Sequence, residues 1–175
     1  EYKVDDDSRG KAAARIEAEM DYSWQANPTM WKRYEGTFTI IKANDATVFQ
    51  VFTNMGHVWS VILDVDREGI LRYVERRGDK TILFNGESIL LRPFHVTVCD
   101  NGEYAEIFID GTSVSNGVPY GGPDSGWERP EGSSTHFRWG TYVTTKNRAG
   151  EVNDAVDSLM FVAGSAVDSV EGTTC

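Results

Sequence analysis

The stretch S-T-H-F-R-W-G-T-Y-V, residues 134–143, is rich in aromatic and β-branched residues and predicts a β-strand. Because alternate residues of a pleated strand share a face, this strand has two sides of different character. One side carries Phe137, Trp139, Thr141 and Val143, and the other carries His136, Arg138, Gly140 and Tyr142. We expect the first side to face a hydrophobic core and the second to carry the function.

The same strand signals recur along the chain. Short runs rich in Val, Ile, Phe, Tyr, Trp and Thr predict strands over residues 37–41, 46–52, 58–65, 81–84, 94–99, 105–109, 137–144 and 158–162. Turn signals containing Gly, Asn or Asp separate these runs, and no long amphipathic helix pattern occurs. The sequence therefore predicts an all-β fold of two stacked antiparallel sheets, a β-sandwich or jelly roll, in a single domain spanning residues 1–175.

Composition and charge exclude several classes of protein. The chain has 175 residues, is 40% hydrophobic and carries a net charge of -10. No apolar run approaches the roughly 20 residues that a membrane helix requires. The acidic balance argues against a nucleic acid partner, since phosphate binding depends on clustered cations. The sequence begins at Glu1 without a methionine or an apolar signal segment, so we expect that a leader has been removed.

Cys99 and Cys175 are the only cysteines. In an oxidising compartment they could form a disulfide that ties the C-terminal tail to an internal strand. The alternative is one buried thiol and one thiol at a frayed terminus. The residues alone leave both interpretations open.

Residues 11–20, K-A-A-A-R-I-E-A-E-M, also allow two interpretations. Their helix propensity is high, and propensity alone predicts a helix. A strand over the same residues would place Arg15, Glu17 and Glu19 on one face.

Residues 113–134 are rich in Gly and Pro and predict a long loop. Long loops in compact domains are usually functional. Tyr120 and Trp127 in this loop would either stack on sugar rings or pin the loop to the body of the protein.

The segment D-V-D-R-E-G-I-L-R-Y-V-E, residues 64–75, has the acid and glycine spacing of a calcium-binding EF-hand loop. An EF-hand also needs a helix on each side, whereas V-W-S-V-I-L before this segment and L-R-Y-V within it predict strands. A β-turn around Glu68-Gly69 explains the same residues. We therefore expect no metal or other cofactor, with a structural calcium ion as the alternative.

Gln50 interrupts the apolar strand T-V-F-Q-V-F, residues 47–52, where it shares a face with Phe52. A buried amide needs a hydrogen-bonding partner, which is either a neighbouring loop or a ligand. A hairpin closed by the turn T-N-M-G would bring Gln50 near Trp59 and Phe52 near His57. His57 would then lie on the Gln50 face, or it is a partly exposed turn residue.

Three short motifs resemble one family of enzymes, whereas the sequence has no serine-nucleophile elbow, no H-E-x-x-H zinc spacing and no phosphate-binding glycine loop. The polysaccharide lyases with a concanavalin A-like β-jelly roll, represented by alginate lyases and similar to glucuronan lyases, carry an R-x-E strand, a Q-[IV]-H strand and a Y-F-K-A-G-x-Y strand in that order. The matching segments here are Arg15-Ile16-Glu17, Gln50-Val51-Phe52 and residues 136–142. The resemblance implies that residues 11–20 form a strand.

The resemblance also implies a secreted enzyme that cleaves an acidic polysaccharide by β-elimination. Gln50, with Arg15 or Arg138, would donate hydrogen bonds to the carboxylate of the uronic acid. Tyr142 would protonate the departing O4. With Arg138 on the same face to stabilise its phenolate, Tyr142 could also remove the C5 proton.

The family's His is replaced by Phe52, which leaves three alternatives. Either His57 reaches the same space, or Tyr142 acts as both base and acid, or catalysis is lost and the protein only binds glycan. The candidate catalytic residues are therefore Arg15, Gln50, His57 and Tyr142. The candidate substrate-binding residues are Glu17, Trp59, Tyr120, Trp127, His136 and Arg138.

The second hypothesis is a non-catalytic, lectin-like carbohydrate-binding module on the same fold, with Trp24, Tyr120 and Trp127 as stacking surfaces. A third is an interaction domain without a glycan ligand. The resemblance favours the first hypothesis, a lyase, which we expect to be a monomer in the extracellular space. Sequence does not decide between alginate, glucuronan and related polyuronates.

Overall fold

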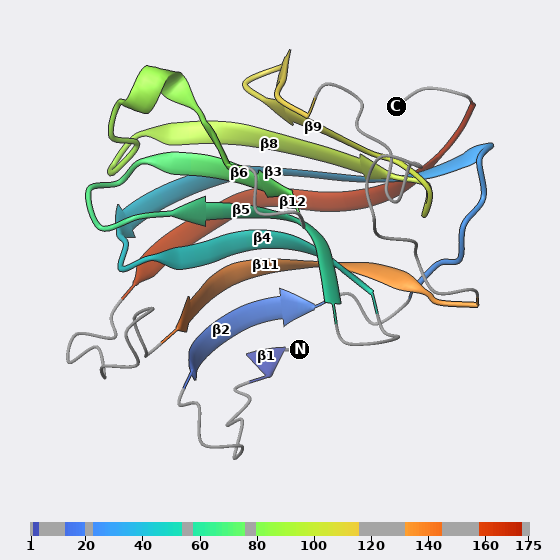
Figure 1. Cartoon of the computed structure of the whole chain (residues 1–175), viewed down its shortest axis with the longest axis horizontal. Coiled ribbons are helices and arrows are strands. Elements are labelled where there is room, and N and C mark those ends of the chain that lie inside the picture. Colours follow the sequence, from blue (N-terminus) through green and yellow to red (C-terminus); the bar gives the residue numbers. More distant parts are fainter. Residues whose placement is uncertain are drawn as a thin grey trace.

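Two antiparallel β-sheets stacked face to face form the body of the protein (Figure 1). The computed structural model describes residues 2–3, 13–19, 23–53, 58–75, 80–115, 132–144 and 158–172. Within these residues the chain is almost entirely β, with one short 3-10 helix, η1 (Phe84–Gly86). The predicted all-β sandwich is therefore confirmed.

The larger sheet contains seven strands and carries all three sequence motifs. Its order is β1 (Tyr2–Lys3), β2 (Ala13–Glu19), β11 (Thr135–Thr144), β4 (Ala46–Thr53), β5 (Val58–Val65), β6 (Leu71–Glu75) and β7 (Lys80–Ile82). β11 comes from the C-terminal part of the chain and inserts between β2 and β4 (Figure 1). The fold thus places the R-x-E, Q-V-F and H-F-R-W-G-T-Y segments on adjacent strands.

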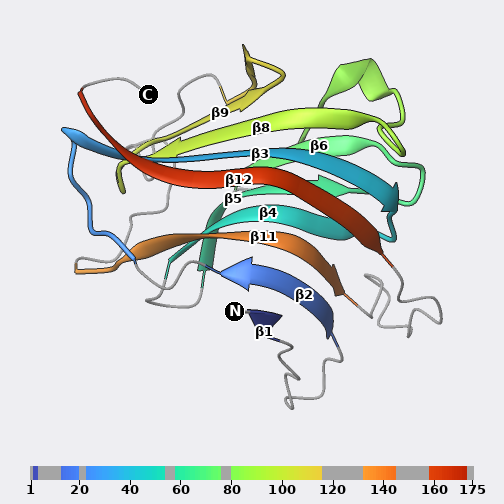
Figure 2. The same ribbon diagram turned by 180° about the vertical axis from the view of Figure 1, so that it is seen from behind.

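The smaller sheet contains five strands and covers one face of the larger sheet. Its order is β10 (Thr112–Ser113), β9 (Ala105–Ile109), β8 (Pro93–Asp100), β3 (Met30–Lys42) and β12 (Leu159–Glu171). Figure 2 shows its two longest strands, β3 and β12, side by side. No helix among the described residues is long and apolar enough to cross a membrane.

Tyr34 on β3 is the centre of the aromatic core between the sheets. Its ring lies 4.9 Å from that of Phe49 on β4 and 5.0 Å from that of Trp139 on β11, and the ring of Phe137 packs against Phe49 at 5.7 Å. Phe137 is fully buried, and Trp139 packs against the core. The predicted core-facing side of β11 is confirmed for these two residues.

Residues 13–19 form a strand despite their helix propensity. β2 pairs antiparallel with β11 along its whole length, from Glu19 opposite Arg138 to Ala13 opposite Thr144. Intrinsic helix propensity favours the helix by only about 0.5 kcal/mol for each residue. The backbone hydrogen bonds and side-chain packing gained by pairing with a neighbouring strand outweigh this preference. The strand that the resemblance implied is confirmed.

Other strands differ in length from the sequence-based prediction. β3 and β12 each span 13 residues and pair with each other, far beyond the predicted ranges 37–41 and 158–162. The small and polar residues of β12 carry little strand signal, so the pairing with β3 extends it. The predicted strand over 81–84 ends at Ile82, because Phe84 and Asn85 adopt left-handed backbone conformations in η1.

The hairpin of β4 and β5 also has a different register from the expected one. Gln50 pairs with Ile62 and Phe52 pairs with Trp59, so the expected proximity of Gln50 to Trp59 is wrong. The pair nearest the turn is Thr53 with Val58, so the connection is two residues longer than the expected one, and a register shift between Val51 and Phe52 adds one further residue on β5. His57 lies outside the described residues.

A second bulge lies in β11. Trp139 pairs with Phe49 and Tyr142 pairs with Thr47, so β11 has one more residue than β4 between these two pairs. Gly140, within this interval, has a φ of 136°, a region that side chains with a Cβ rarely adopt. β11 therefore bends at Gly140 while its pairing with β2 stays regular.

Cys99 on β8 is fully buried and disulfide-bonded, and the described chain has no free cysteine. The only other cysteine of the sequence is Cys175, which lies outside the described residues. Of the two alternatives for the cysteines, the disulfide is the one observed. A bridge between these two positions of the sequence encloses β9, β10, β11 and β12 in one long covalent loop.

We expect Cys175→Ser to lower the melting temperature by about 10 °C, because a cross-link that closes a loop of this length contributes about 4 kcal/mol. Differential scanning calorimetry with and without a thiol reductant checks this. Reduction should lower the melting temperature of the unmodified protein to that of the variant and leave the variant unchanged. A reductant effect of equal size on both proteins would contradict the assignment.

Candidate active site

The face of the seven-stranded sheet that points away from the core carries the candidate residues in rows across β2, β11, β4 and β5. One row contains Glu19, Arg138, Gln50 and Ile62, and another contains Arg15, Tyr142, Thr47 and Asp64. A third contains His136, Phe52 and Trp59, while Glu17 pairs with Gly140. For Arg15, Glu17, Trp59 and Tyr142 the structure gives the position in the register only.

The backbone thus brings most of the predicted site together. Directly paired residues on adjacent strands point to the same side of a sheet. The positions of Arg15, Gln50, Arg138 and Tyr142 therefore share one face, as the motifs implied. Three of the predicted site residues, His57, Tyr120 and Trp127, lie outside the described residues.

Arg138 is the best-fixed side chain of this face. Its Nη2 lies 3.0 Å from Glu19 Oε2, and its Nε donates a hydrogen bond of 3.0 Å to His136 Nε2. Its guanidinium carbon lies 3.9 Å from the centre of the Phe52 ring. An ion pair, a hydrogen bond and a cation–π contact therefore hold the guanidinium in one orientation. Glu19 was missed as a site residue, although its place on the Arg15–Glu17 face was a signal for it.

His136 is buried beside Arg138 and is electrically neutral. Burial, together with the positive charge of Arg138, lowers the pKa of His136 to about 4, and the opposing influence of Glu19 is smaller. Its Nε2 accepts the hydrogen bond of 3.0 Å from Arg138 Nε and lies 3.2 Å from Glu19 Oε1, so His136 contacts both members of the ion pair. The ring also packs against Phe52, with the two ring centres 5.3 Å apart.

Gln50 lies in the middle of this face, directly opposite Arg138 on one side and Ile62 on the other. It is only 6% exposed. A buried amide next to a fixed guanidinium provides neutral and charged hydrogen-bond donors within one patch.

Two sequence-based expectations for this face change. Arg138 was expected to stabilise the Tyr142 phenolate, but it is engaged with Glu19 and His136, and the cross-strand neighbour of Tyr142 is Arg15. Trp24 was a candidate stacking surface, but it is buried in the core. Its indole Nε1 donates a hydrogen bond of 2.7 Å to Asp100 Oδ1, so the buried indole N–H has an acceptor.

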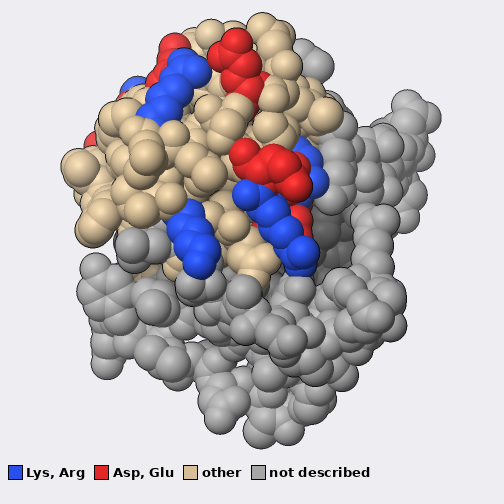
Figure 3. Space-filling model, turned by 90° about the vertical axis from the view of Figure 1, so that its left-hand side faces the viewer, with Lys and Arg blue, Asp and Glu red and all other residues tan. Residues whose placement is uncertain are grey.

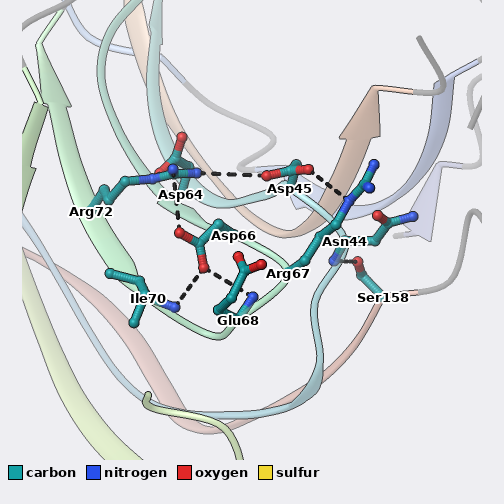
Figure 4. Close-up of polar contacts among 9 residues, drawn as sticks. All are labelled: Asn44, Asp45, Asp64, Asp66, Arg67, Glu68, Ile70, Arg72 and Ser158. Carbon is teal, nitrogen blue, oxygen red and sulfur yellow. Dashed lines mark hydrogen bonds and ion pairs between the residues drawn. The ribbon is translucent and has the colours of Figure 1, made fainter. Parts of the chain in front are cut away.

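The loop with calcium-like spacing is a charged hairpin turn between β5 and β6. Arg72 lies at its centre, with Nε 2.6 Å from Asp64 Oδ1, Nη1 3.4 Å from Asp66 Oδ2 and Nη2 3.9 Å from Asp45 Oδ1 (Figure 4). Figure 3 shows one end of the molecule, where Lys and Arg side chains (blue) lie against Asp and Glu side chains (red).

Asp66 also caps the turn itself. Its Oδ1 accepts hydrogen bonds from the backbone N–H groups of Glu68, at 3.1 Å, and Ile70, at 2.8 Å (Figure 4). Among the described residues no group of three or more His, Cys, Asp or Glu side chains is arranged to hold a metal ion. The acids of this loop thus bind Arg72 and the turn backbone, which is the β-turn interpretation of the sequence.

Comparison with known proteins gives a fold and no close relative. No family model matches the sequence, and no curated protein matches it. An alginate lyase from Alteromonas sp. 272 has a TM-score of 0.62 at 13% identity, over 97% of this chain and 83% of its own. An alginate lyase from Pseudomonas aeruginosa has a TM-score of 0.64 at 13% identity, over 92% of this chain and 76% of its own.

A third structure, a family 7 alginate lyase in complex with substrate (GGMG), has a TM-score of 0.66 at 12% identity and covers 99% of this chain and 82% of its own. At these identities the likeness establishes the architecture. The fold is the β-jelly roll of the alginate lyases, and the family resemblance first seen in three short motifs is confirmed at the level of the fold.

We expect Arg72→Gln to lower the free energy of unfolding by about 2 kcal/mol, because it removes the positive charge that lies between Asp64 and Asp66. Chemical denaturation at neutral pH measures this. The matched control is Arg67→Gln: Arg67 is 52% exposed and pairs with Asp45, which is 45% exposed, so its loss should be below about 0.5 kcal/mol. Equal losses for the two variants would show that the central position of Arg72 is unimportant.

We expect His136 to destabilise the folded protein as the pH falls below about 6.5. In the unfolded chain its pKa is near 6.5, whereas the folded protein resists protonation down to about 4, so the unfolded state binds more protons between these values. Relative to His136→Gln, the unmodified protein should lose about 1.5 kcal/mol of stability between pH 6.5 and 5. Denaturation at both pH values checks this, and parallel pH profiles of the two proteins would contradict it.

Proposed function

We propose that the protein is a secreted polysaccharide lyase that cleaves a uronic-acid polysaccharide of the alginate or glucuronan type by β-elimination. The observation that carries the proposal is the insertion of β11 between β2 and β4, which brings the three family motifs onto one face. The jelly-roll fold shared with alginate lyases supports it.

The chemistry requires three actions on one uronic acid residue. The carboxylate on C5 must be neutralised so that the C5 proton becomes acidic. A base then removes this proton, a C4–C5 double bond forms as the C4–O4 bond breaks, and an acid protonates O4. In this proposal the Arg138 guanidinium and the Gln50 amide hold the carboxylate, because they lie opposite each other in the register.

Tyr142 serves as both base and acid in this scheme. Its register position is opposite Arg15, a cation that favours the phenolate of a side chain whose free pKa is about 10. The phenolate takes the C5 proton and returns it to O4, so the enzyme ends in its starting state. A single proton carrier favours sugars in which the C5 proton and O4 lie on the same side of the ring.

A glycan-binding module without catalysis is the second candidate function, and Phe52 is the observation that favours it. Phe52 stands where the family motif has His, and a phenyl ring neither accepts nor donates a proton. Both functions would use the same face of the seven-stranded sheet. They differ in their product, because only a lyase generates an unsaturated sugar that absorbs ultraviolet light.

An extracellular location, a monomeric state and an acidic polysaccharide partner belong to the same proposal. The disulfide at Cys99 supports the location, since structural disulfides persist mainly in oxidising compartments. With a net charge of -10, a polyanionic substrate has to be held by local cations such as Arg138 rather than by the overall field.

Ultraviolet absorbance of the unsaturated product, measured with alginate, polymannuronate, polyguluronate, glucuronan and ulvan, tests this function. We expect a rise with at least one polymer and a loss of roughly 100-fold or more in Tyr142→Phe, because that change removes the proton carrier. Tyr104→Phe is the matched control: Tyr104 is 42% exposed, lies outside this face and should leave the rate unchanged.

No absorbance with any polymer, combined with a thermal shift on addition of one of them, would move the assignment to the binding module. A full rate in Tyr142→Phe would remove Tyr142 from the reaction and leave the fold assignment untouched.

A further inference from the structure

Arg138 uses one edge of its guanidinium within the protein and leaves the other edge open. Nε and Nη2 form the side edge of the group, and they contact His136 Nε2 and Glu19 Oε2, each at 3.0 Å. A guanidinium has five N–H donors in a planar fork. Among the described residues, no acceptor contacts the end edge, formed by Nη1 and the second N–H of Nη2.

Phe52 fixes the plane of this guanidinium. The distance of 3.9 Å from the guanidinium carbon to the ring centre means that the two planar groups are in contact. Arg138 is 13% exposed, so water competes little with this contact. Phe52 stands directly opposite His136 in the register, and its ring therefore supports both partners of the cluster.

His136 contributes to the same arrangement because it is neutral. A protonated imidazole would have no lone pair to accept the hydrogen bond from Arg138, and it would repel the guanidinium. A neutral ring beside Arg138 and Phe52 avoids both effects. Acceptors thus hold the side edge of the guanidinium and the Phe52 ring covers one of its faces. Within this described cluster, the end edge is the pair of Arg138 donors that can bind a ligand together.

We propose that Phe52 is a positioning residue of the binding site: its ring and the side edge contacts of Arg138 aim the end edge of the guanidinium at a carboxylate of the polysaccharide, which it binds through two parallel hydrogen bonds. This inference rests on the proposed function. It gives the Phe at this motif position a role in ligand binding, in place of the proton transfer that an imidazole would perform.

The first test needs no ligand. A hydrogen-bonded, buried Arg Nε–H exchanges slowly with water, so nitrogen–proton NMR should show a protected Arg138 resonance in the unmodified protein. Phe52→Leu removes the ring with little change in hydrophobicity and should abolish this protection, whereas Phe52→Tyr, which keeps the ring, should restore it. An unprotected resonance in the unmodified protein, or equal protection in Phe52→Leu, overturns the positioning role whatever the polymer assays show.

The second test measures affinity for an alginate tetrasaccharide by calorimetry, in a Tyr142→Phe background that prevents turnover. Phe52→Leu should weaken binding about tenfold, the effect of a cation–π contact shielded from water. In an Arg138→Met background the same change should alter the affinity less than about twofold, because the group that Phe52 orients is gone. Phe161→Leu, at an exposed position on β12, is the control and should bind normally.

A tenfold loss that persists in the Arg138→Met background would show that Phe52 acts on the ligand directly and would overturn the inference. Equal affinity for the tetrasaccharide and its carboxyl-reduced form would overturn the carboxylate contact. A protected Arg138 resonance in a protein that binds no polyuronate would refute the proposed function together with the carboxylate contact, and it would leave the ring–guanidinium contact intact.

Discussion

The antiparallel pairing of β11 with β2 on one side and β4 on the other is the constraint on which the rest of the structure depends. It joins a strand near the C-terminus to one near the N-terminus and to a third between them. Its apolar side completes the aromatic core around Tyr34. Its polar side places Arg138 beside both Glu19 and Gln50. The same strand pairing therefore forms both the core and the candidate site.

Alternating apolar and polar residues made the all-β class and most strands predictable, and the two faces of β11 followed from the period of two alone. The predictions that failed concern features that depend on a partner strand or a distant residue. The length of β12 depends on its pairing with β3, and the register of Gln50 depends on the length of the β4–β5 connection and on an extra residue in β5. Trp24 is buried in the core, where its N–H finds an acceptor in the distant Asp100. None of these is encoded in the segment concerned.

The candidate site was partly predictable for a similar reason. Arg15, Gln50, Arg138 and Tyr142 could be placed on one face because each lies on a strand with a clear alternation. The contacts of Arg138 with Phe52 and Glu19 could not, because they require the order of strands in space. Likewise, the acids of residues 64–75 have the spacing of a calcium loop, and only the hairpin register shows that Arg72 occupies their centre.

The bulge at Gly140 shows how β11 keeps its shape although several of its residues differ from the family motif. The bulge at this position needs a backbone conformation that few other residues tolerate, whereas Trp139 and Arg138 beside it differ from the family motif without harm to the strand. The backbone at this position therefore restricts the choice of residue more than the chemistry of the neighbouring side chains does. A strand of this shape can carry different polar side chains on its outer face, so one architecture can serve different ligands without a change in strand pairing.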